Sequence, residues 1–515
     1  MSKISQLAKF VSSFQGLTVL FLISGIFLLL KYAIKRRRYS HLIPSRNKRF
    51  IDVWGDFNIF PRTAFYEAAG LSLTAVILQY LNGLFHLYKN EVLFSIWIGY
   101  TPFICLNKPE AVEEVLGGRK INEKAWFYDW LHCWLGTGLL TSHGQKWKSR
   151  RRLLTPAFHF DILKDFLPVI NERSRLLVKI LEEETTKDYT SIVSPITLCS
   201  LDIICQTTLG VDINCQENKE SEYVKAVVKV SDVVTKRITN MFSWFDFTFF
   251  LIEGRGIKKD LKLLHDFTMS VIREKKRQML SSSNNDSTKK RKALMDLLLQ
   301  HHIETKELSE EDIREEVDTF AFEGHDTTSM AMSWTLYFIG LYKDVQEKIH
   351  EELDEIFGED RDREITTDDL RDMNYLDCVL KESLRLCPSV PVIARKANTE
   401  TNICGYQIPK GASLVMMPYN LHRNEEIYPN PEVFDPNRFT PENSANRHPY
   451  AYIPFSAGSR NCIGQRFAIM EEKVILANLL RNYKLESLDP RDKMITSIEL
   501  ILRSTKDIRI KIRPR

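Results

Sequence analysis

The sequence carries almost no excess of charge. Lys and Arg number 71 and Asp and Glu number 67, which leaves a formal charge of +4 on 515 residues. Nucleic-acid binders usually show a strong basic excess, so the composition gives no electrostatic case for that class, and we expect no nucleic-acid partner. Intrinsic disorder as the main state is excluded, because hydrophobic residues make up 44% of the chain and can form a large core.

Cysteine is sparse as well. Nine cysteines are spread from Cys105 to Cys462 without a CxxC pair, and an odd number in so long a chain argues against a disulfide scaffold. Most of these thiols are expected to be small buried side chains in a reducing compartment. Nucleotide-binding loops are missing too: no GxGxxG or P-loop pattern occurs, and Gly254-Arg255-Gly256 is too short to count.

One long apolar run lies near the N-terminus. Residues 16–34 are mostly apolar and come close to the ~20 residues that span a bilayer. Four basic residues, Lys35–Arg38, follow directly, so the positive-inside rule places the rest of the chain in the cytosol. A cleaved signal peptide has the reverse order of charge and apolar core, and a buried core helix leaves the basic cluster unexplained. We predict an uncleaved signal anchor over residues 1–38 and one domain over residues 39–515.

Two further apolar segments follow. Polar residues interrupt Ala69–Phe85, which favours an amphipathic helix over a second membrane span. Met241–Ile252 is unusually aromatic, and two interpretations of it stay open. It is either ordinary core or a surface that dips into a membrane monolayer and lets lipophilic substrates enter.

The rest of the chain reads as mostly helical with a smaller sheet. Residues 91–106 are typical of a strand, a turn and a second strand. Residues 310–341 contain no proline and predict a helix of about thirty residues. Short strands are expected at 393–397 and 413–417, and the polar stretch 281–292 predicts a solvated loop. The fold class is therefore mostly α with a smaller β region.

The segment PFSAGSRNCIG carries the chemistry. It holds Phe455, Gly458, Arg460, Cys462 and Gly464 in the pattern FxxGxRxCxG. A helical pattern begins just after Cys462, so backbone N–H groups and the helix dipole can stabilise its thiolate. The glycines allow a flat ligand to approach, and the arginine can pair with an anionic group on it. The whole pattern favours a haem-ligating thiolate over a lone buried thiol.

This segment resembles the haem-binding signature of the cytochrome P450 superfamily, and further motifs in the right order extend the resemblance over nearly the whole chain after the anchor. The resemblance implies the cytochrome P450 fold and a haem b cofactor whose iron takes Cys462 as its axial ligand. Phe455 and Arg460 would belong to the same cofactor-binding loop.

The resemblance implies further haem contacts. Trp147 and Arg151 form WxxxR, which is similar to a motif that donates hydrogen bonds to a haem propionate, and Arg395 resembles a second propionate partner beside Arg460. Arginine suits a buried carboxylate because its guanidinium donates in a bidentate geometry. Arg151 is expected to point inward. Its basic neighbours are expected to lie partly outward: Lys146, Lys148, Arg150 and Arg152.

A second motif is structural rather than catalytic. Glu382 and Arg385 form ExxR, a spacing that puts both side chains on one helix face. In the resembled family, the equivalents of these two residues and of Arg438 form a buried charged triad near the haem. The family often has Glu where this chain has Asn437, a tolerated departure.

The long helix holds an acid and an alcohol. Glu323, Asp326 and Thr327 are expected on one helix face, and a kink or an opened turn at Gly324 would make room for O₂ and water. An acid beside an alcohol in a dry pocket suits proton delivery. In the resembled enzymes Thr327 would support oxygen activation, Asp326 would relay protons, and Thr328 would be supporting.

Glu323 narrows the resemblance. Most of the superfamily has a small residue here, whereas EVDTFAFEGHDTT looks like the signature of family 4, the long-chain fatty-acid and lipid hydroxylases. There the matching glutamate can form an ester with a haem methyl group. Two alternatives stay open for Glu323: that ester, or a free buried carboxyl with a raised pKa.

The resemblance implies a membrane-bound monooxygenase of the endoplasmic reticulum, with its catalytic domain in the cytosol. Electrons would come from the separate NADPH-dependent cytochrome P450 reductase, with cytochrome b5 as a second donor, and basic residues near Trp147 together with Arg466 could form the landing surface. The first candidate activity is ω-hydroxylation of fatty acids.

Other activities stay open. The insect branch of the family, which the chain resembles around ANTETNICGYQIPKG and EGHDTT, suggests oxidation of hormone-like terpenoids or xenobiotics. More distant rivals are a hydroperoxide isomerase on the same fold and a haem binder without turnover; the pair Asp326-Thr327 argues against the isomerase. One departure concerns the hinge. Only Pro44 and later Pro61 stand where related enzymes carry a proline-rich segment, which argues against a stiff hinge.

Overall fold

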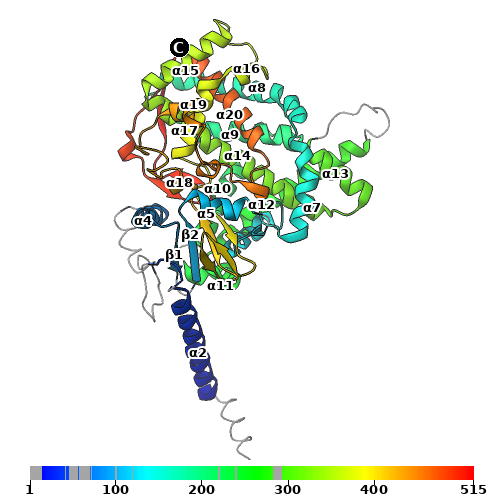
Figure 1. The fold of residues 1–515 in the computed structure, drawn as a ribbon. Helices are drawn as coiled ribbons and strands as arrows, with labels where there is room; N and C mark the ends of the chain where they lie inside the picture. Colours follow the sequence, from blue (N-terminus) through cyan, green and yellow to red (C-terminus); the bar gives the residue numbers. More distant parts are fainter. Residues whose placement is uncertain are drawn as a thin grey trace, which may run out of the picture.

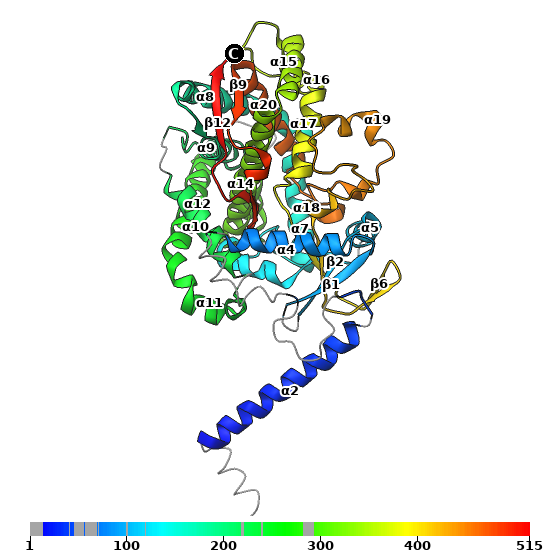
Figure 2. The same cartoon turned by 90° about the vertical axis from the view of Figure 1, so that its left-hand side faces the viewer.

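The computed structural model describes residues 14–40, 42–45, 56, 70, 72–98, 101–118, 120–217, 221–237, 240–281 and 293–515. Pro61 and nearly all of the loop expected at 281–292 lie outside these residues. Figure 1 shows a mainly helical body from which the N-terminal helix α2 (Phe14–Ser40) projects on one side. A second view confirms that this helix stands away from the body (Figure 2).

Helix α2 has the properties expected of an anchor. Residues Gly16–Ile34 have a mean hydropathy of 2.3 over 19 residues, and only 6% of that window is buried. The helix is therefore long and apolar enough to cross a membrane. The chain after it is tied to the body, since the Ser95 amide donates to the Pro44 carbonyl at 2.8 Å and Ser45 pairs with Ser95 as a parallel bridge.

The largest sheet has five strands in the order β1-β2-β8-β5-β3. They are β1 (Leu93–Ile98), β2 (Thr101–Leu106), β8 (Ser413–Met416), β5 (Ile393–Lys396) and β3 (Glu123–Lys124). β2 and β8 run parallel, and the other pairs are antiparallel. The four strands predicted at 91–106, 393–397 and 413–417 are confirmed.

Smaller sheets join elements far apart in the sequence. They consist of β4 (Thr190–Ser191), β12 (Arg509–Pro514) and β9 (Tyr483–Ser487); of β10 (Thr496–Ile498) and β11 (Leu502–Ser504); and of β6 (Thr401–Ile403) and β7 (Tyr406–Ile408).

Helices make up most of the body. They are α4 (Leu73–Leu87), α5 (Pro109–Leu116), α6 (His132–Leu135), α7 (Gly144–Leu154), α8 (Phe160–Glu182), α9 (Val193–Ile204), α10 (Glu222–Lys236), α11 (Asp246–Ile252), α12 (Lys258–Ser281), α13 (Leu294–Thr305), α14 (Glu310–Leu341), α15 (Lys343–Phe357), α16 (Asp369–Asp372), α17 (Asn374–Leu386), α18 (Pro418–Leu421), α19 (Pro441–Ser444) and α20 (Gln465–Asn482). Helix α4 occupies the segment for which an amphipathic helix was predicted. Short 3-10 turns that position the site are η2 (Trp126–Leu131), η6 (Met241–Trp244) and η10 (Gly458–Arg460).

Helix α14 is 32 residues long and largely buried, and it has the predicted bounds. Its N-terminus is closed by a capping box, in which Ser309 and Asp312 bond each other's backbone N–H groups. Of the two alternatives expected at Gly324, a kink or an opened turn, the structure shows no opened turn, because the helix runs unbroken from Glu310 to Leu341. A side chain at Gly324 would lie 2.7 Å from Ile204 of α9, so the glycine serves close packing of two helices.

Candidate active site

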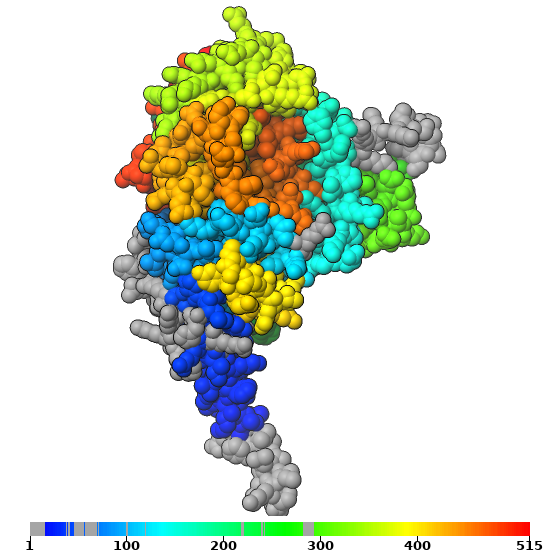
Figure 3. All heavy atoms as spheres, in the orientation of Figure 1, coloured from blue at the N-terminus to red at the C-terminus, as the bar shows by residue number. Residues whose placement is uncertain are grey.

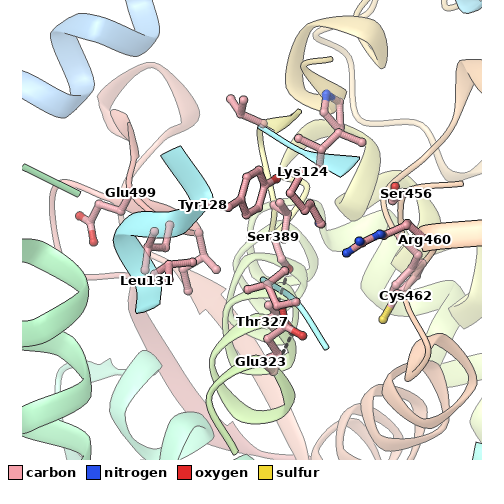
Figure 4. Close-up of a pocket in the computed structure, with 18 of the residues that line it drawn as sticks. Lys124, Tyr128, Leu131, Glu323, Thr327, Ser389, Ser456, Arg460, Cys462 and Glu499 are labelled. Atoms are coloured by element: carbon pink, nitrogen blue, oxygen red, sulfur yellow. Dashed lines mark hydrogen bonds between the residues drawn. The ribbon is translucent and has the colours of Figure 1, made fainter. Parts of the chain in front are cut away.

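A cavity of about 430 Å³ lies between α14, the cysteine loop, η2 and the five-stranded sheet. Most of its wall is apolar, and its size is typical of a small-molecule site. Figure 4 shows Glu323 and Thr327 on α14 on one side, and Arg460 and Cys462 on the loop at the other. The motifs at 323–328 and at 455–464 thus meet at one space, as the sequence predicted.

The cysteine loop is held in shape by its own backbone. The Cys462 amide donates to the Phe455 carbonyl at 2.9 Å, and Gly464 caps α20. Gly458 has a φ of +71°, and a side chain there would lie 1.8 Å from the Leu116 carbonyl oxygen of α5. The sequence assigned this glycine to the approach of a flat ligand, but the contact that requires it is with α5.

The Cys462 side chain lines the cavity and is exposed to it. Desolvation by the surrounding protein atoms and, second to it, the Glu323 carboxyl across the cavity raise the pKa of its thiol to about 11, against the opposing effects of the Gly464 amide and Arg151. The helix terminus alone therefore does not hold a thiolate here. A metal ion bound to the sulfur would supply the missing positive charge.

Trp147 and Arg460 form a cation–π pair on the cavity wall. The guanidinium of Arg460 lies 4.2 Å from the centre of the buried Trp147 ring, and its Nη2 donates to the Ser142 carbonyl at 2.7 Å. Arg151 points inward, as predicted, and lines the cavity. Its two terminal nitrogens donate to the Asn461 carbonyl at 2.8 Å and to Asn461 Oδ1 at 2.7 Å, which ties α7 to the cysteine loop.

The prediction for Arg150 was wrong. Its side chain is buried, donating to Asp312 at 2.6 Å and lying 3.4 Å from Glu316. The reason is that the acidic first turns of α14 face α7, so Arg150 is drawn inward by charges the local sequence does not contain. Lys148 and Arg152 are exposed, as expected. Lys146 is half-buried.

Helix α14 presents a mixed face to the cavity. Glu323, Thr327 and Thr328 line it. Both threonines bond back to their own helix, since Thr327 Oγ1 donates to the Glu323 carbonyl at 2.6 Å and Thr328 Oγ1 donates to the Gly324 carbonyl at 2.5 Å. The Thr327 carbonyl in turn accepts from Ser389 Oγ at 2.8 Å.

Asp326 does not share that face, which corrects the expectation. Its carboxylate accepts from Arg503 Nη2 at 2.8 and 2.9 Å and is absent from the cavity wall. Successive residues in a helix are about 100° apart, so Asp326 and Thr327 diverge although Glu323 and Thr327 align. Glu499 does line the cavity, and its carboxylate lies 3.0 Å from Arg503 Nε.

Glu323 is the acid that faces the cavity from α14. Burial raises the pKa of its carboxyl to about 7, and the positive charge of Lys124 partly offsets this. A carboxyl in this setting is costly to ionise, so it favours a partner or a neutral form.

The predicted charged triad is present. Arg385 donates to Glu382 through Nε at 2.7 Å and Nη2 at 2.8 Å, and both side chains are fully buried. Arg385 Nη1 also donates to the His422 carbonyl at 3.0 Å. Arg438 joins more loosely, with Nε 3.6 Å from Glu382, while its Nη2 donates to backbone carbonyls of Pro429 and Asn430.

Sequence reasoning missed Lys124, Tyr128 and Glu499 on the cavity wall. Lys124 stands in a strand of two residues, too short for any periodic signal. Glu499 lies in the turn between β10 and β11 and belongs to no motif. The apolar run that follows it, Leu500–Leu502, gives no sign that this acid faces a cavity.

The residues present fit a haem. A thiol and several cations converge on one dry cavity, which suits an iron ligand and two carboxylates. Two donors of Arg460, Nε and Nη1, are buried without a partner among the described residues. Arg395 is 2% exposed, and the hydrogen bond found for its side chain goes from Nη1 to the carbonyl of its neighbour Ala394. Such donors call for an anion that the protein itself does not supply.

Comparison with known proteins agrees with this geometry. The family described as Cytochrome P450 matches residues 68–512. Cytochrome P450 4V2 of Rattus norvegicus is 47% identical over 449 residues, 85% of each chain. Cytochrome P450 4c3 of Drosophila melanogaster is 48% identical over 435 residues, 82% of this chain and 81% of its own. Cytochrome P450 4c21 of Blattella germanica is 41% identical over 436 residues, 83% of this chain and 86% of its own. The family match spans every site residue named above.

Proposed function

Because the chain belongs to the cytochrome P450 family, and within it to family 4, we propose that this haem-thiolate monooxygenase hydroxylates the terminal carbon of fatty acids. The family sets the reaction class: one oxygen atom of O₂ enters a C–H bond, and a reductase partner supplies electrons. The substrate class and the terminal position are the proposal.

The haem, when bound, supplies the activation of O₂, and a thiolate ligand favours cleavage of the O–O bond. Cys462 would hold the iron, and Trp147, Arg151, Arg395 and Arg460 would hold the rest of the ring and its carboxylates. The cysteine loop, including Phe455, keeps the sulfur at a fixed place.

Residues of helix α14 would transfer protons to oxygen in the cavity. Thr327 and Thr328 both line the cavity and both donate their hydroxyl protons to carbonyls of α14. The Thr327 hydroxyl would pass a proton by turning from the Glu323 carbonyl toward the cavity. Asp326 is held away by Arg503, so a relay through Asp326 would need this ion pair to open.

The observation that carries the fatty-acid proposal is the position of Glu323 on the cavity wall beside Thr327. An ester from this carboxyl to the haem would fix the ring and the wall together. A rigid, narrow approach would then admit only the end of an alkyl chain, although internal C–H bonds are weaker. The apolar lining suits such a chain.

We place the protein in the endoplasmic reticulum membrane, anchored by residues 1–38, with the domain at 39–515 in the cytosol. Phe245, just before α11, and Phe247, within it, are both exposed. Helix α11 lies at the end of the body from which α2 projects (Figure 1). This favours the membrane-dipping interpretation of the segment.

The partner would be the NADPH-dependent cytochrome P450 reductase, with cytochrome b5 as a second donor. Exposed Lys148, Arg152 and Arg466 lie on α7 and at the start of α20. In the space-filling view α7 and the following residues (cyan) adjoin the cysteine-loop region (orange), which supports one basic landing surface above Cys462 (Figure 3).

A second candidate is oxidation of terpenoids or xenobiotics. Three tryptophans meet on the cavity wall: the Trp244 ring centre lies 5.1 Å from Trp126 and 6.2 Å from Trp130. Such an aromatic wall suits unsaturated and branched substrates as well as straight chains.

The test is turnover of the full-length protein with reductase, NADPH and O₂ over a panel of fatty acids and terpenoids, scored by product position. Mostly ω-hydroxy fatty acid is expected. Turnover of terpenoids or xenobiotics alone would discard the fatty-acid assignment. Rearrangement of a hydroperoxide without NADPH consumption would point to an isomerase, and haem binding without any product to a non-catalytic haem protein.

A further inference from the structure

A second cavity, of about 140 Å³, lies where the N-terminal helix meets the body. Figure 1 and Figure 2 both show the end of α2 that joins the body beside β1. Four segments line this junction pocket: the last turns of α2, the start of β2, the start of η2 and the turn before β8. The lining residues are Tyr32, Thr101, Pro102, Trp126 and residues 409–412.

Contacts between α2 and the main sheet fix the position of this pocket. Ala33 and Arg36 are 1% and 2% exposed, so one side of the helix end is buried against the body. The Arg36 guanidinium lies 5.5 Å from the centre of the Trp97 ring, and Trp97 is the strand partner of Pro102 on the pocket wall. A cation therefore lies beside the strand pair that carries the pocket.

The junction pocket brings together hydrogen-bond donors that the described residues leave unused. Thr101, Trp126 and Lys410 line it, and among the described residues no hydrogen bond or ion pair of these three side chains is found. None of the described residues on its wall is acidic. An ammonium group, an indole N–H and a hydroxyl around one space suit an anion with several oxygen atoms.

The depth of the pocket relative to the membrane points to the source of that anion. The apolar run of α2 ends at Ile34, and Tyr32 lies in its last turn, so the pocket stands at the level of the lipid headgroups when α2 spans the membrane. Leu28 and Leu29 precede Tyr32 by one turn on the same helix face and are about half exposed. The acyl chains of a lipid bound in the pocket would lie over these leucines.

We propose that the junction pocket binds the phosphate group of an anionic phospholipid, with Lys410 as its cation and Thr101 and Trp126 as further donors. A phosphoglycerol headgroup fits better than phosphocholine, because no described acid lines the pocket to pair with the choline cation. A lipid held there would fix the body against the anchor. The inference rests on the proposed membrane anchor and is independent of the substrate.

The experiment uses the full-length holoenzyme in nanodiscs of phosphatidylcholine with a rising fraction of phosphatidylglycerol. A phosphatidylglycerol analogue with a photoreactive headgroup labels the protein, and peptide mapping locates the label. Lys410→Met removes the charge, Lys410→Arg keeps it, and Thr101→Val removes a hydroxyl at nearly constant shape. Lys396→Met is the control, because Lys396 is exposed on β5 of the same sheet and does not line the pocket.

Labelling of the native protein should saturate and should map to the segments around Thr101 and Lys410. Lys410→Met should raise the half-saturating fraction of phosphatidylglycerol about tenfold or more, which is the loss expected when a charged hydrogen bond is removed. Thr101→Val should raise it by a smaller factor, whereas Lys410→Arg and Lys396→Met should stay near the native value. Equal shifts in Lys410→Met and Lys396→Met would show a diffuse effect of surface charge and would overturn the proposal.

Competitors distinguish the possible sources of the anion. Unlabelled phosphatidylglycerol should displace the analogue, whereas inorganic phosphate and a fatty acid at equal concentration should not. Trp126 also lines the main cavity, so displacement by the fatty acid would show that the pocket holds a substrate carboxylate. Displacement by inorganic phosphate would show a site for a free ion. Either result overturns the proposal.

Failure of the anchor gives a different result from failure of the pocket. A chain that does not enter nanodiscs would overturn the proposed anchor and this inference together. A chain that enters them but shows no saturable labelling around Thr101 and Lys410 would overturn this inference alone. That second result would leave the anchor and the proposed hydroxylation of fatty acids untouched.

Discussion

Arg503 clamps Asp326 through hydrogen bonds of 2.8 and 2.9 Å from one guanidinium nitrogen, and the Asp326 side chain is only 4% exposed. The same arginine also holds Glu499 on the cavity wall. The acid next to Thr327 is therefore fixed to strand β11, and through Arg503 it is linked to Glu499 in the turn between β10 and β11. The Arg503–Asp326 ion pair thus joins helix α14 to the strand pair β10 and β11 near the C-terminus.

Removing Arg503 should leave a buried carboxylate unpaired. We expect Arg503→Met to lower the free energy of unfolding by about 3–5 kcal/mol, because a buried charge that loses its partner is strongly destabilising. The double variant Arg503→Met/Asp326→Asn should recover part of that loss. Urea unfolding of the native protein, of Arg503→Met, of Asp326→Asn and of the double variant measures the coupling, and strictly additive losses would contradict it.

The triad predicts unequal tolerance of two arginines. Arg385→Lys should cost about 3 kcal/mol or more, because lysine cannot reproduce the two-pronged contact with Glu382 in a site without water. Arg438→Lys should cost clearly less, since Arg438 lies 3.6 Å from Glu382 and is partly solvated. The yield of folded, haem-loaded protein and its unfolding midpoint test the order, and equal losses would argue against it.

Sequence alone identified the parts of the site that are fixed locally. Cys462, Trp147 and the ExxR pair lie within motifs whose spacing already defines a loop or a helix face. The bounds of α14 followed from its lack of proline.

The errors came from contacts between distant segments. Nothing in the run Arg150-Arg151-Arg152 says which arginine meets the acidic start of α14, because Asp312 is far along the chain. The orientation of Asp326 was mispredicted because its partner Arg503 lies in β11, far along the chain. Lys124 was missed because its strand β3 pairs with β5 through two residues only.

Burial of Glu316 predicts a pH effect on stability. Burial raises the pKa of this carboxyl from 4.5 to about 7, against the opposing effects of the Leu139 amide and Arg150. Between these values the folded chain holds a proton that the unfolded chain has released, so this group's contribution to stability falls as pH rises from about 4.5 to 7.

Between about pH 4.5 and pH 7, the window set by those two pKa values, the native protein should lose unfolding free energy as the pH rises. Glu316→Gln should lose less over the same window, because its side chain does not titrate. Exposed Glu359→Gln is the matched control and should keep the native slope. Urea unfolding across this range measures both. An identical slope in the native protein and Glu316→Gln would contradict the assignment.

The exposed phenylalanines predict a dependence on how substrate is presented. Phe245 and Phe247 are 72% and 76% exposed, and burying each in lipid is worth about 1.5–3 kcal/mol. Phe245→Ser/Phe247→Ser should raise KM for a lipophilic substrate dissolved in vesicles and leave KM in detergent unchanged. Val433→Ser, at a distant exposed site, should change neither, and equal effects in both media would remove the membrane role.

Glu323 is expected to be bound covalently to the haem. Its carboxyl is buried on the cavity wall with a pKa raised to about 7, and an ester removes the cost of ionising it there. The denatured native chain should carry the mass of the haem and keep its colour in acidic acetone, whereas Glu323→Gln, the isosteric variant, should lose both.

The Glu323 variants also show whether the position of oxidation depends on a covalently fixed haem or on the shape of the side chain at residue 323. If the ester fixes the haem against α14, Glu323→Gln and Glu323→Ala should both shift products from the terminal carbon toward the weaker internal C–H bonds, because the ring can then move. If native protein releases all its haem but still oxidises the terminal carbon, the side chain acts by shape. In that case Glu323→Gln should keep the native product ratio while Glu323→Ala, which enlarges the cavity, should not. The product ratio of Glu323→Gln therefore decides whether the covalent link to the haem or the shape of the side chain directs oxidation to the terminal carbon of the substrate.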